Sequence, residues 1–143
     1  MFFNQSSLIG NYRFMVEIGN LYVAGFSEVS GLTVETEFEE YREGGVNDYV
    51  HKLAKGTRHV PIVLKRGIGY STELWDWHND VVAGRIRRLS GSIILFDDRF
   101  REYRRWTFND AYPVKWIGPD LNASVSEVAI EQIELVHNGF KLR

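Results

Sequence analysis

Apolar and polar side chains alternate with a period of two along most of this chain, and no other feature limits its fold as strongly. Between residues 12 and 18, Tyr12, Phe14, Val16 and Ile18 alternate with Arg13, Met15 and Glu17. A strand places successive side chains on opposite faces, so the pattern predicts a half-buried strand. Gly19-Asn20 fits a two-residue hairpin loop, because glycine accepts a positive φ. Residues 21–29 are then the predicted return strand.

Further short segments rich in β-branched and aromatic residues predict strands at 33–41, 49–53, 60–65, 92–96, 102–108, 111–117 and 128–137. Pro61 places the start or edge of a strand near residue 60. Turn signals separate them at 30–31, 43–48, 55–57, 97–99 and 118–120. Residues 49–53 would return from 33–41 as a long hairpin. We therefore expect roughly eight strands.

Two of these segments are also compatible with a helix. Residues 33–41 could be helical, but Thr33, Val34, Thr36 and Phe38 favour a strand. In residues 128–137, Val128 and Ile130 have one parity, whereas Ile133 and Leu135 have the other. Either a strand with a bulge near Glu131 or a short helix would explain that change, and the strand is the favoured interpretation.

One segment, residues 71–84, has the helical pattern instead. Ser71 or Thr72 can cap its start, and Glu73 suits the positive end of the helix dipole. Leu74, Trp77 and Val81 follow at spacings of three and four, which gives one apolar stripe. Gly84 is a suitable end. The predicted class is mainly β, with one inserted helix.

Composition sets the size and setting of the domain. The chain has 143 residues, 44% of them hydrophobic, which suits one domain with its own core. It has no cysteine, so disulfides and thiolate metal sites are excluded. We predict an N-terminal arm over residues 1–11 and a single domain over 12–143. Residues 1–5 show no signal-peptide pattern, which predicts cytoplasmic synthesis, and no apolar run approaches the roughly 20 residues of a membrane helix.

Charge is unevenly distributed in a chain whose net charge is only −2. Between residues 28 and 48 lie seven acids and a single base, Arg42. Between residues 85 and 105 lie seven arginines and three acids. The two stretches are either separate solvated faces or complementary surfaces for head-to-tail association.

The motifs of common active sites are absent from the sequence. The four histidines form no HxH or HExxH pair. Asp97-Asp98 fits a turn better than a carboxylate pair, and Gly67-Ile68-Gly69 lacks the lysine of a phosphate loop. Arginines interleaved with Tyr103 and Trp106 suit a protein interface or a nucleic-acid surface. We expect no catalytic residue, no metal site and no cofactor.

Seven segments in order resemble those of contractile tail tube proteins, including the inner tubes of extracellular contractile injection systems. They are residues 26–32 (FSEVSGL), 39–47 (EEYREGGVN), 64–67 (LKRG), 74–77 (LWDW), 111–116 (AYPVKW), 118–122 (GPDLN) and 128–131 (VAIE). The resemblance runs from about Tyr12 to Gly139. It departs at residues 51–56, where a charged segment replaces a turn rich in proline or glycine.

This resemblance implies a fold, an assembly and partners. The implied fold is two packed antiparallel sheets that form a barrel-like sandwich with one flanking helix. The implied function is structural: hexameric rings stack into a hollow tube that sheath contraction drives through a target envelope. The implied partners are copies of the chain, the sheath, and baseplate and spike proteins, with room for a protein cargo in the lumen and no direct membrane insertion. The implied setting is an assembled, released particle.

Two alternatives stay open at this stage. One is a baseplate tube-initiator paralogue of the same family, and the other is a monomeric β-barrel that binds a small ligand. If the chain is a tube subunit, we expect two groups of residues at the contacts between subunits. They are Glu35, Glu37, Glu39, Glu40, Tyr41, Arg42, Glu43, Gly44, Gly45 and Val46, and Arg99, Arg101, Arg104 and Arg105.

Overall fold

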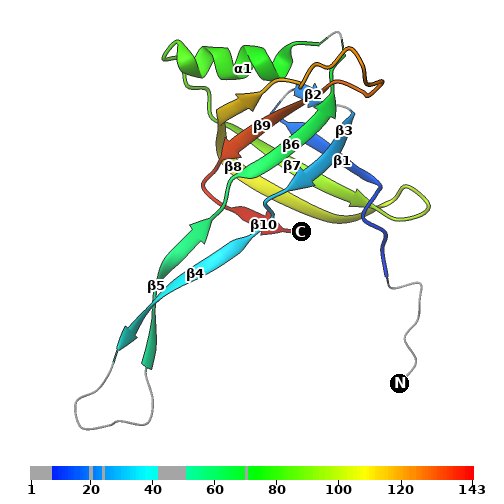
Figure 1. The fold of residues 1–143 in the computed structure, drawn as a ribbon. Coiled ribbons are helices and arrows are strands. Elements are labelled where there is room, and N and C mark those ends of the chain that lie inside the picture. Colours follow the sequence, from blue (N-terminus) through cyan, green and yellow to red (C-terminus); the bar gives the residue numbers. More distant parts are fainter. Residues whose placement is uncertain (1–7, 20, 24, 42–50, 70) are drawn as a thin grey trace.

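The computed structural model describes residues 8–19, 21–23, 25–41, 51–69 and 71–143. These residues form ten strands and one helix (Figure 1). In chain order they are β1 Phe14–Ile18, β2 Leu21–Val23, β3 Phe26–Ser30, β4 Val34–Tyr41, β5 His51–His59, β6 Ile62–Gly67, α1 Glu73–Val82, β7 Leu89–Phe96, β8 Glu102–Ile117, β9 Ile130–Val136 and β10 Phe140–Leu142.

The long strand β8 connects two antiparallel sheets. Up to Ala111 it pairs with β7, and β10 lies on its other side. From Tyr112 onward it pairs with β9, which continues to β6 and β3. Asp110, at the change of partner, has a φ of 53°, which breaks the regular strand geometry there. The strand order is β2-β1-β7-β8-β9-β6-β3, so the predicted two-sheet class is confirmed, but the barrel is not closed.

The core lies between the two sheets and beneath α1. Val16, Ile18, Leu64, Phe108 and Ile133 are at most 1% exposed. They come from β1, β6, β8 and β9, so the alternation of apolar residues has placed one face of each of these strands inward. The half-buried strand predicted over residues 12–18 is confirmed as β1.

The predicted helix is also confirmed. Leu74 and Trp77 are buried, and the Trp77 indole nitrogen donates a hydrogen bond to the Arg87 carbonyl at 3.1 Å. Ser71 Oγ accepts a hydrogen bond from the Glu73 amide at 3.4 Å, which satisfies one free N–H of the first turn. The chain leaves the helix through Gly84, whose φ is 86°.

Three strand predictions need correction. Residues 21–29 are two strands, because Gly25, with a φ of 88°, separates β2 from β3 and the two pair with different partners. The turn predicted at 55–57 lies inside β5. The register between β4 and β5 shifts there, because Glu37 pairs with Gly56 whereas Phe38 pairs with Ala54, which is a bulge. The segments 102–108 and 111–117 form one continuous strand, β8.

The segment 128–137 forms β9, so the strand interpretation is confirmed and the helix is not. The bulge predicted near Glu131 is wrong, since β9 pairs with β6 in unbroken register across that position. Glu131, Ile133 and Leu135 all face the core, whereas Ile130 is 43% exposed on the other face. The change of parity therefore reflects a buried glutamate and not an extra residue.

Candidate subunit-assembly surfaces

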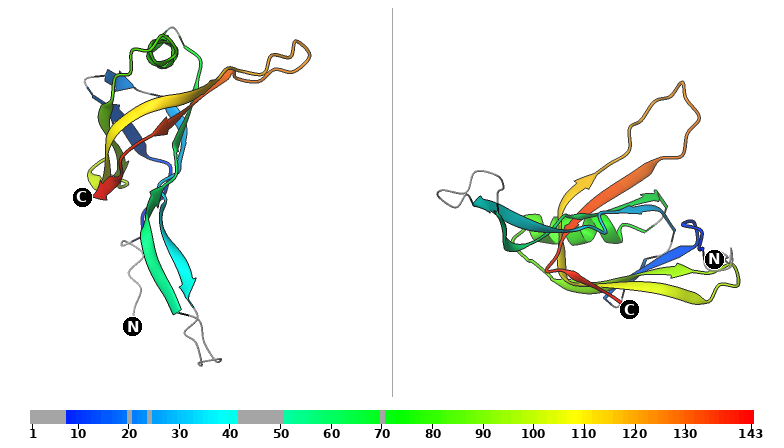
Figure 2. Two further views of the ribbon diagram at one scale, coloured as in Figure 1. Left: turned by 90° about the vertical axis from the view of Figure 1, so that its left-hand side faces the viewer. Right: turned by 90° about the horizontal axis from the view of Figure 1, so that it is seen from below.

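The hairpin of β4 and β5 projects from the body of the subunit, as Figures 1 and 2 show. Among the described residues, these two strands pair only with each other. All eight residues of β4 are exposed. An isolated two-stranded hairpin is marginally stable in water, so a projecting hairpin of this length is expected to gain stability from a neighbouring surface.

Apolar side chains on this hairpin have no covering layer within the subunit. Val34, Phe38, Tyr41 and Leu53 are each between 51% and 54% exposed. The ammonium of Lys52 lies 5.3 Å from the centre of the Phe38 ring, which covers part of one face. The predicted alternation of residues 33–41 therefore exists, but its apolar side is not buried within the subunit.

Basic side chains on β5 lie opposite some of the acids on β4, so the hairpin offsets part of its own negative charge. In the register of the two strands, Arg58 lies opposite Glu35 and Lys52 lies opposite Glu40. Glu37 and Glu39 instead lie opposite Gly56 and Leu53. Cross-strand neighbours of opposite charge attract each other, so Glu37 and Glu39 are the acids with least local compensation. Of the predicted contact residues, Arg42, Glu43, Gly44, Gly45 and Val46 lie outside the described residues.

The predicted arginine group lies at the turn between β7 and β8. Asp97 organises this turn, since its Oδ1 accepts hydrogen bonds from the Arg99 and Arg101 amides, both at 2.9 Å. Its Oδ2 also accepts one from the Arg101 guanidinium at 3.0 Å. The bond from the Arg101 amide, followed by the one from Arg99, holds the pKa of Asp97 below its usual value. Asp97 is thus a turn residue, as the sequence predicted.

The four arginines of this group differ in how far they are engaged within the subunit. Arg105 binds Glu102 at 2.6 Å and Glu17 at 3.4 Å, and the hydrogen bonds that it donates to Glu102 raise its pKa. Arg104 lies over the Tyr103 ring at 4.6 Å. Within the described part of the chain, neither Arg99 nor Arg104 forms an ion pair. Those two are the arginines most available to another molecule.

The structure does not bring the acidic and the arginine groups together. The β4–β5 hairpin leaves one side of the body, and the β7–β8 turn lies on another (Figure 1). Within one subunit the two groups are therefore separate surfaces. Such a separation permits contact between different copies, which is the geometry that head-to-tail association requires.

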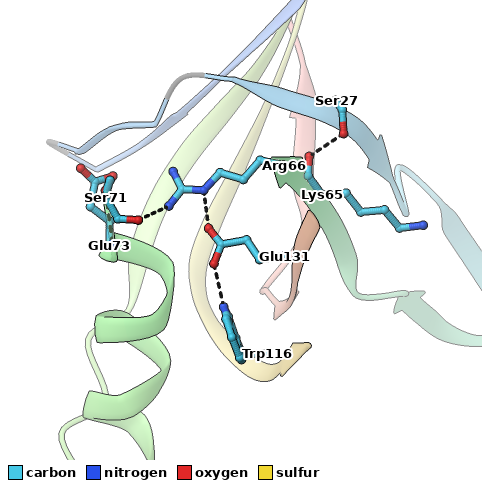
Figure 3. Close-up of polar contacts among 7 residues, drawn as sticks. All are labelled: Ser27, Lys65, Arg66, Ser71, Glu73, Trp116 and Glu131. Atoms are coloured by element: carbon cyan, nitrogen blue, oxygen red, sulfur yellow. Dashed lines mark hydrogen bonds and ion pairs between the residues drawn. The ribbon is translucent and has the colours of Figure 1, made fainter. Parts of the chain in front are cut away.

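A buried polar network, which the sequence analysis missed, fastens the helix to the sheets (Figure 3). Arg66 on β6 donates to Glu131 on β9 at 2.5 Å, and Glu131 accepts a second hydrogen bond from the Trp116 indole at 3.1 Å. Arg66 also reaches the Ser71 carbonyl at 3.5 Å. Both charged side chains are less than 10% exposed. The sequence signal of this buried network was the change at Glu131 from apolar residues at even positions to apolar residues at odd positions.

The described residues form open surface grooves and no cluster of metal ligands. They contain no group of three or more potential metal ligands. A groove of about 290 Å³ between the sheets is lined by residues that include Phe14, Leu32 and Trp106, and it opens to the surface. A larger open groove of about 580 Å³ lies where the residues before β1 meet the β7–β8 turn, and its lining includes Arg13, Asp97 and Arg99. Among these residues, no helix has both the length and the apolarity needed to cross a bilayer.

The comparison with known families decides what kind of subunit this is. Residues 10–141 match the family described as T4-like virus tail tube protein gp19. The chain belongs to this family. The match covers nearly the whole described fold, from the residues before β1 to β10. The resemblance found in the seven sequence segments is thereby confirmed.

Solved structures of tail tube relatives have the same fold. A chain of the sheath-tube complex of an extracellular contractile injection system, PVC, in its extended state is 27% identical. It aligns over 95% of this chain and 91% of its own length, with a TM-score of 0.86. A chain of the baseplate of the anti-feeding prophage, AFP, is also 27% identical, over 96% and 97% of the two chains, with a TM-score of 0.87.

A more distant neighbour shares the fold alone. Hcp1 from Flavobacterium johnsoniae is 15% identical over 90% of this chain and 93% of its own, with a TM-score of 0.57. No curated protein compared with the chain matches it. The family and the structural neighbours of this chain are tube proteins. The chain is therefore a structural tail tube subunit and not an enzyme.

Proposed function

We propose that this tail tube protein forms hexameric rings that stack into the hollow inner tube of a contractile particle. The β4–β5 hairpin is the observation that carries the proposal. It projects from the body, pairs with no other described strand and exposes about half of Val34, Phe38 and Leu53. A neighbouring copy that covers the hairpin removes this apolar surface from water.

The ends of the larger sheet support a ring. β2 and β3 stand at the two ends of the strand order, and each is paired on one side only among the described strands. Open edges invite association, and a closed ring of copies covers them. We propose that edge contacts close each ring and that the hairpin joins neighbouring subunits.

Charge then sets the register of these contacts. The least compensated acids are Glu37 and Glu39, and Arg99 and Arg104 form no ion pair within the described residues. The two groups are on separate surfaces of one subunit. Exposed ion pairs contribute only about 0–1 kcal/mol each, so apolar and edge contacts supply most of the affinity. The charged groups guide encounter and orientation.

The structural relatives support a proposal about the particle in which this chain works. The PVC relative comes from a sheath-tube complex and the AFP relative from a baseplate. We propose equivalent sheath and baseplate partners for this chain, with a spike at the tip, a lumen that can hold cargo, and action within a released particle. Sheath contraction would drive the rigid tube through a target envelope.

Electron microscopy of the purified full-length protein at neutral pH tests the proposal. We expect rings or tubes with sixfold symmetry. A protein that stays monomeric at every concentration examined would contradict it. Rings that never stack, but that bind added baseplate proteins, would instead indicate the tube-initiator paralogue.

A further inference from the structure

Two histidines meet where the projecting hairpin joins the body. His59 is the last residue of β5, and His137 directly follows β9. Their ring centres are 5.4 Å apart, and the Phe140 ring lies 5.7 Å from His59 and 6.1 Å from His137. Figure 1 shows β10, which begins at Phe140, beside the root of the hairpin.

The hydrogen bonds of His137 require its neutral form. One ring nitrogen, Nε2, lies 3.1 Å from the Val60 carbonyl, which can only accept, so Nε2 carries the proton. The other, Nδ1, accepts a hydrogen bond from the Gly139 amide at 3.0 Å. A proton added to Nδ1 would face that N–H and would abolish the bond. Val60 is the first of the two residues between β5 and β6, so His137 directly holds the root of the hairpin.

The His59 ring has little room to move when the hydrogen bonds of His137 change. Its Nδ1 is buried without a hydrogen-bond partner among the described residues. On its other side, a Cβ built on Gly139 would lie 3.0 Å from His59 Nε2, and Gly139 itself has a φ of 110°. The glycine thus permits a close approach that a larger residue would prevent.

Within the described part of the chain, neither His59 nor His137 forms an ion pair with a surrounding carboxylate. Arg58 precedes His59 on β5 and points to the opposite face, with Glu35 across from it. Lys141 follows Phe140 on β10, and Asp110 on β8 is bonded to Asn138 at 3.3 Å. Burial, followed by the nearby His59 ring, lowers the pKa of His137.

We propose that His137, packed against the His59 ring, forms an acid-sensitive latch that seats the hairpin while the His137 ring is neutral and releases it when that ring is protonated. The consequence for tubes rests on the proposed function, in which the hairpin contacts another copy. A histidine whose folded pKa is lowered leaves stability intact above its unfolded pKa of about 6.5 and reduces it as pH falls below that value. Tubes are therefore expected to loosen in mildly acidic medium.

Sedimentation of assembled protein at about pH 7.5 and about pH 5.5 tests the latch across the range in which histidine titrates. We expect the wild type to leave about tenfold more free subunit at the lower pH, which corresponds to about 1.4 kcal/mol. His59→Phe keeps a ring against Phe140, and His137→Gln keeps a donor for the Val60 carbonyl. Each should reduce the response, and the double variant should lose it.

The control is His78→Gln, which alters a histidine on α1 and should respond to pH as the wild type does. Hydrogen exchange of the Gly139 amide in unassembled subunits gives a second readout that needs no tube. Corrected for its intrinsic pH dependence, it should accelerate at the lower pH in the wild type and not in the double variant. Unchanged protection of Gly139 at the lower pH, or a loss of the response in His78→Gln, would overturn the latch. A wild type that never assembles would refute the tube proposal and leave the latch to be decided by Gly139.

Discussion

Replacement of Phe38 by threonine tests the hairpin contact most directly. Phe38 lies on β4, is 53% exposed and contacts Lys52 across the hairpin. Threonine keeps a β-branched side chain, so the propensity of the strand is retained while the aromatic surface is lost. The isolated subunit should therefore fold almost as before, and assembly should weaken.

The size of the effect follows from the exposed area. Aromatic side chains bury about 150–250 Å², and phenylalanine, the smallest of them, lies in the lower part of this range. About half of that area, roughly 80–100 Å², remains for a neighbouring copy to cover. At about 25 cal/mol per Å², that area contributes about 2–2.5 kcal/mol per contact. The free subunit concentration in equilibrium with tubes should rise by about 30- to 60-fold.

Sedimentation over a concentration series measures this quantity, and thermal unfolding of dilute subunits checks the fold. Ile86→Thr is the matched control, because Ile86 is 51% exposed but lies after α1, away from the hairpin. It should leave assembly close to that of the wild type. Tubes of Phe38→Thr that form at the wild-type concentration would refute the reasoning, and so would an equal loss in Ile86→Thr.

Three further predictions concern other parts of the subunit. Arg99→Glu with Arg104→Glu should slow assembly more than it weakens finished tubes, and a time course of light scattering that matches the wild type would contradict this. Glu131→Gln should leave the buried Arg66 charge unpaired and lower stability by about 3–5 kcal/mol, which denaturant unfolding measures; an unchanged midpoint would refute it. Valine at both Gly44 and Gly45 should leave the subunit folded but block tube growth, and normal tubes by electron microscopy would disprove that expectation.

Local sequence was sufficient for most individual elements. The alternation at Phe14 and Val16 predicted β1, and the spacing of Leu74 and Trp77 predicted α1, because the two periodicities are local properties of the backbone. Boundaries were less predictable. Residues 21–29 form two strands, since Gly25 allows a positive φ that redirects the chain.

The contact residues were only partly accessible to the same reasoning. Counting charges separated an acidic from an arginine-rich stretch, but it could not reveal that Arg58 and Lys52 oppose two of the acids or that Arg105 is held by Glu102. The first two pairings join residues on the two strands of the β4–β5 hairpin, and the third joins residues three apart at the start of β8, beside the β7–β8 turn. They depend on strand register and turn geometry, which the charge pattern does not determine.

The sequence by itself determined the class of strands, the single helix, the absence of common catalytic motifs and the resemblance to tail tube proteins. Tertiary structure alone decided that the apolar side of β4 faces outward, that Glu131 pairs with Arg66 inside the core, and that His59 meets His137 at the hairpin root. The physical reason is that the spacing of apolar residues indicates which side chains lie on the same face of a helix or strand. What that face contacts depends on how distant strands are arranged, and within the subunit every residue of β4 is left exposed.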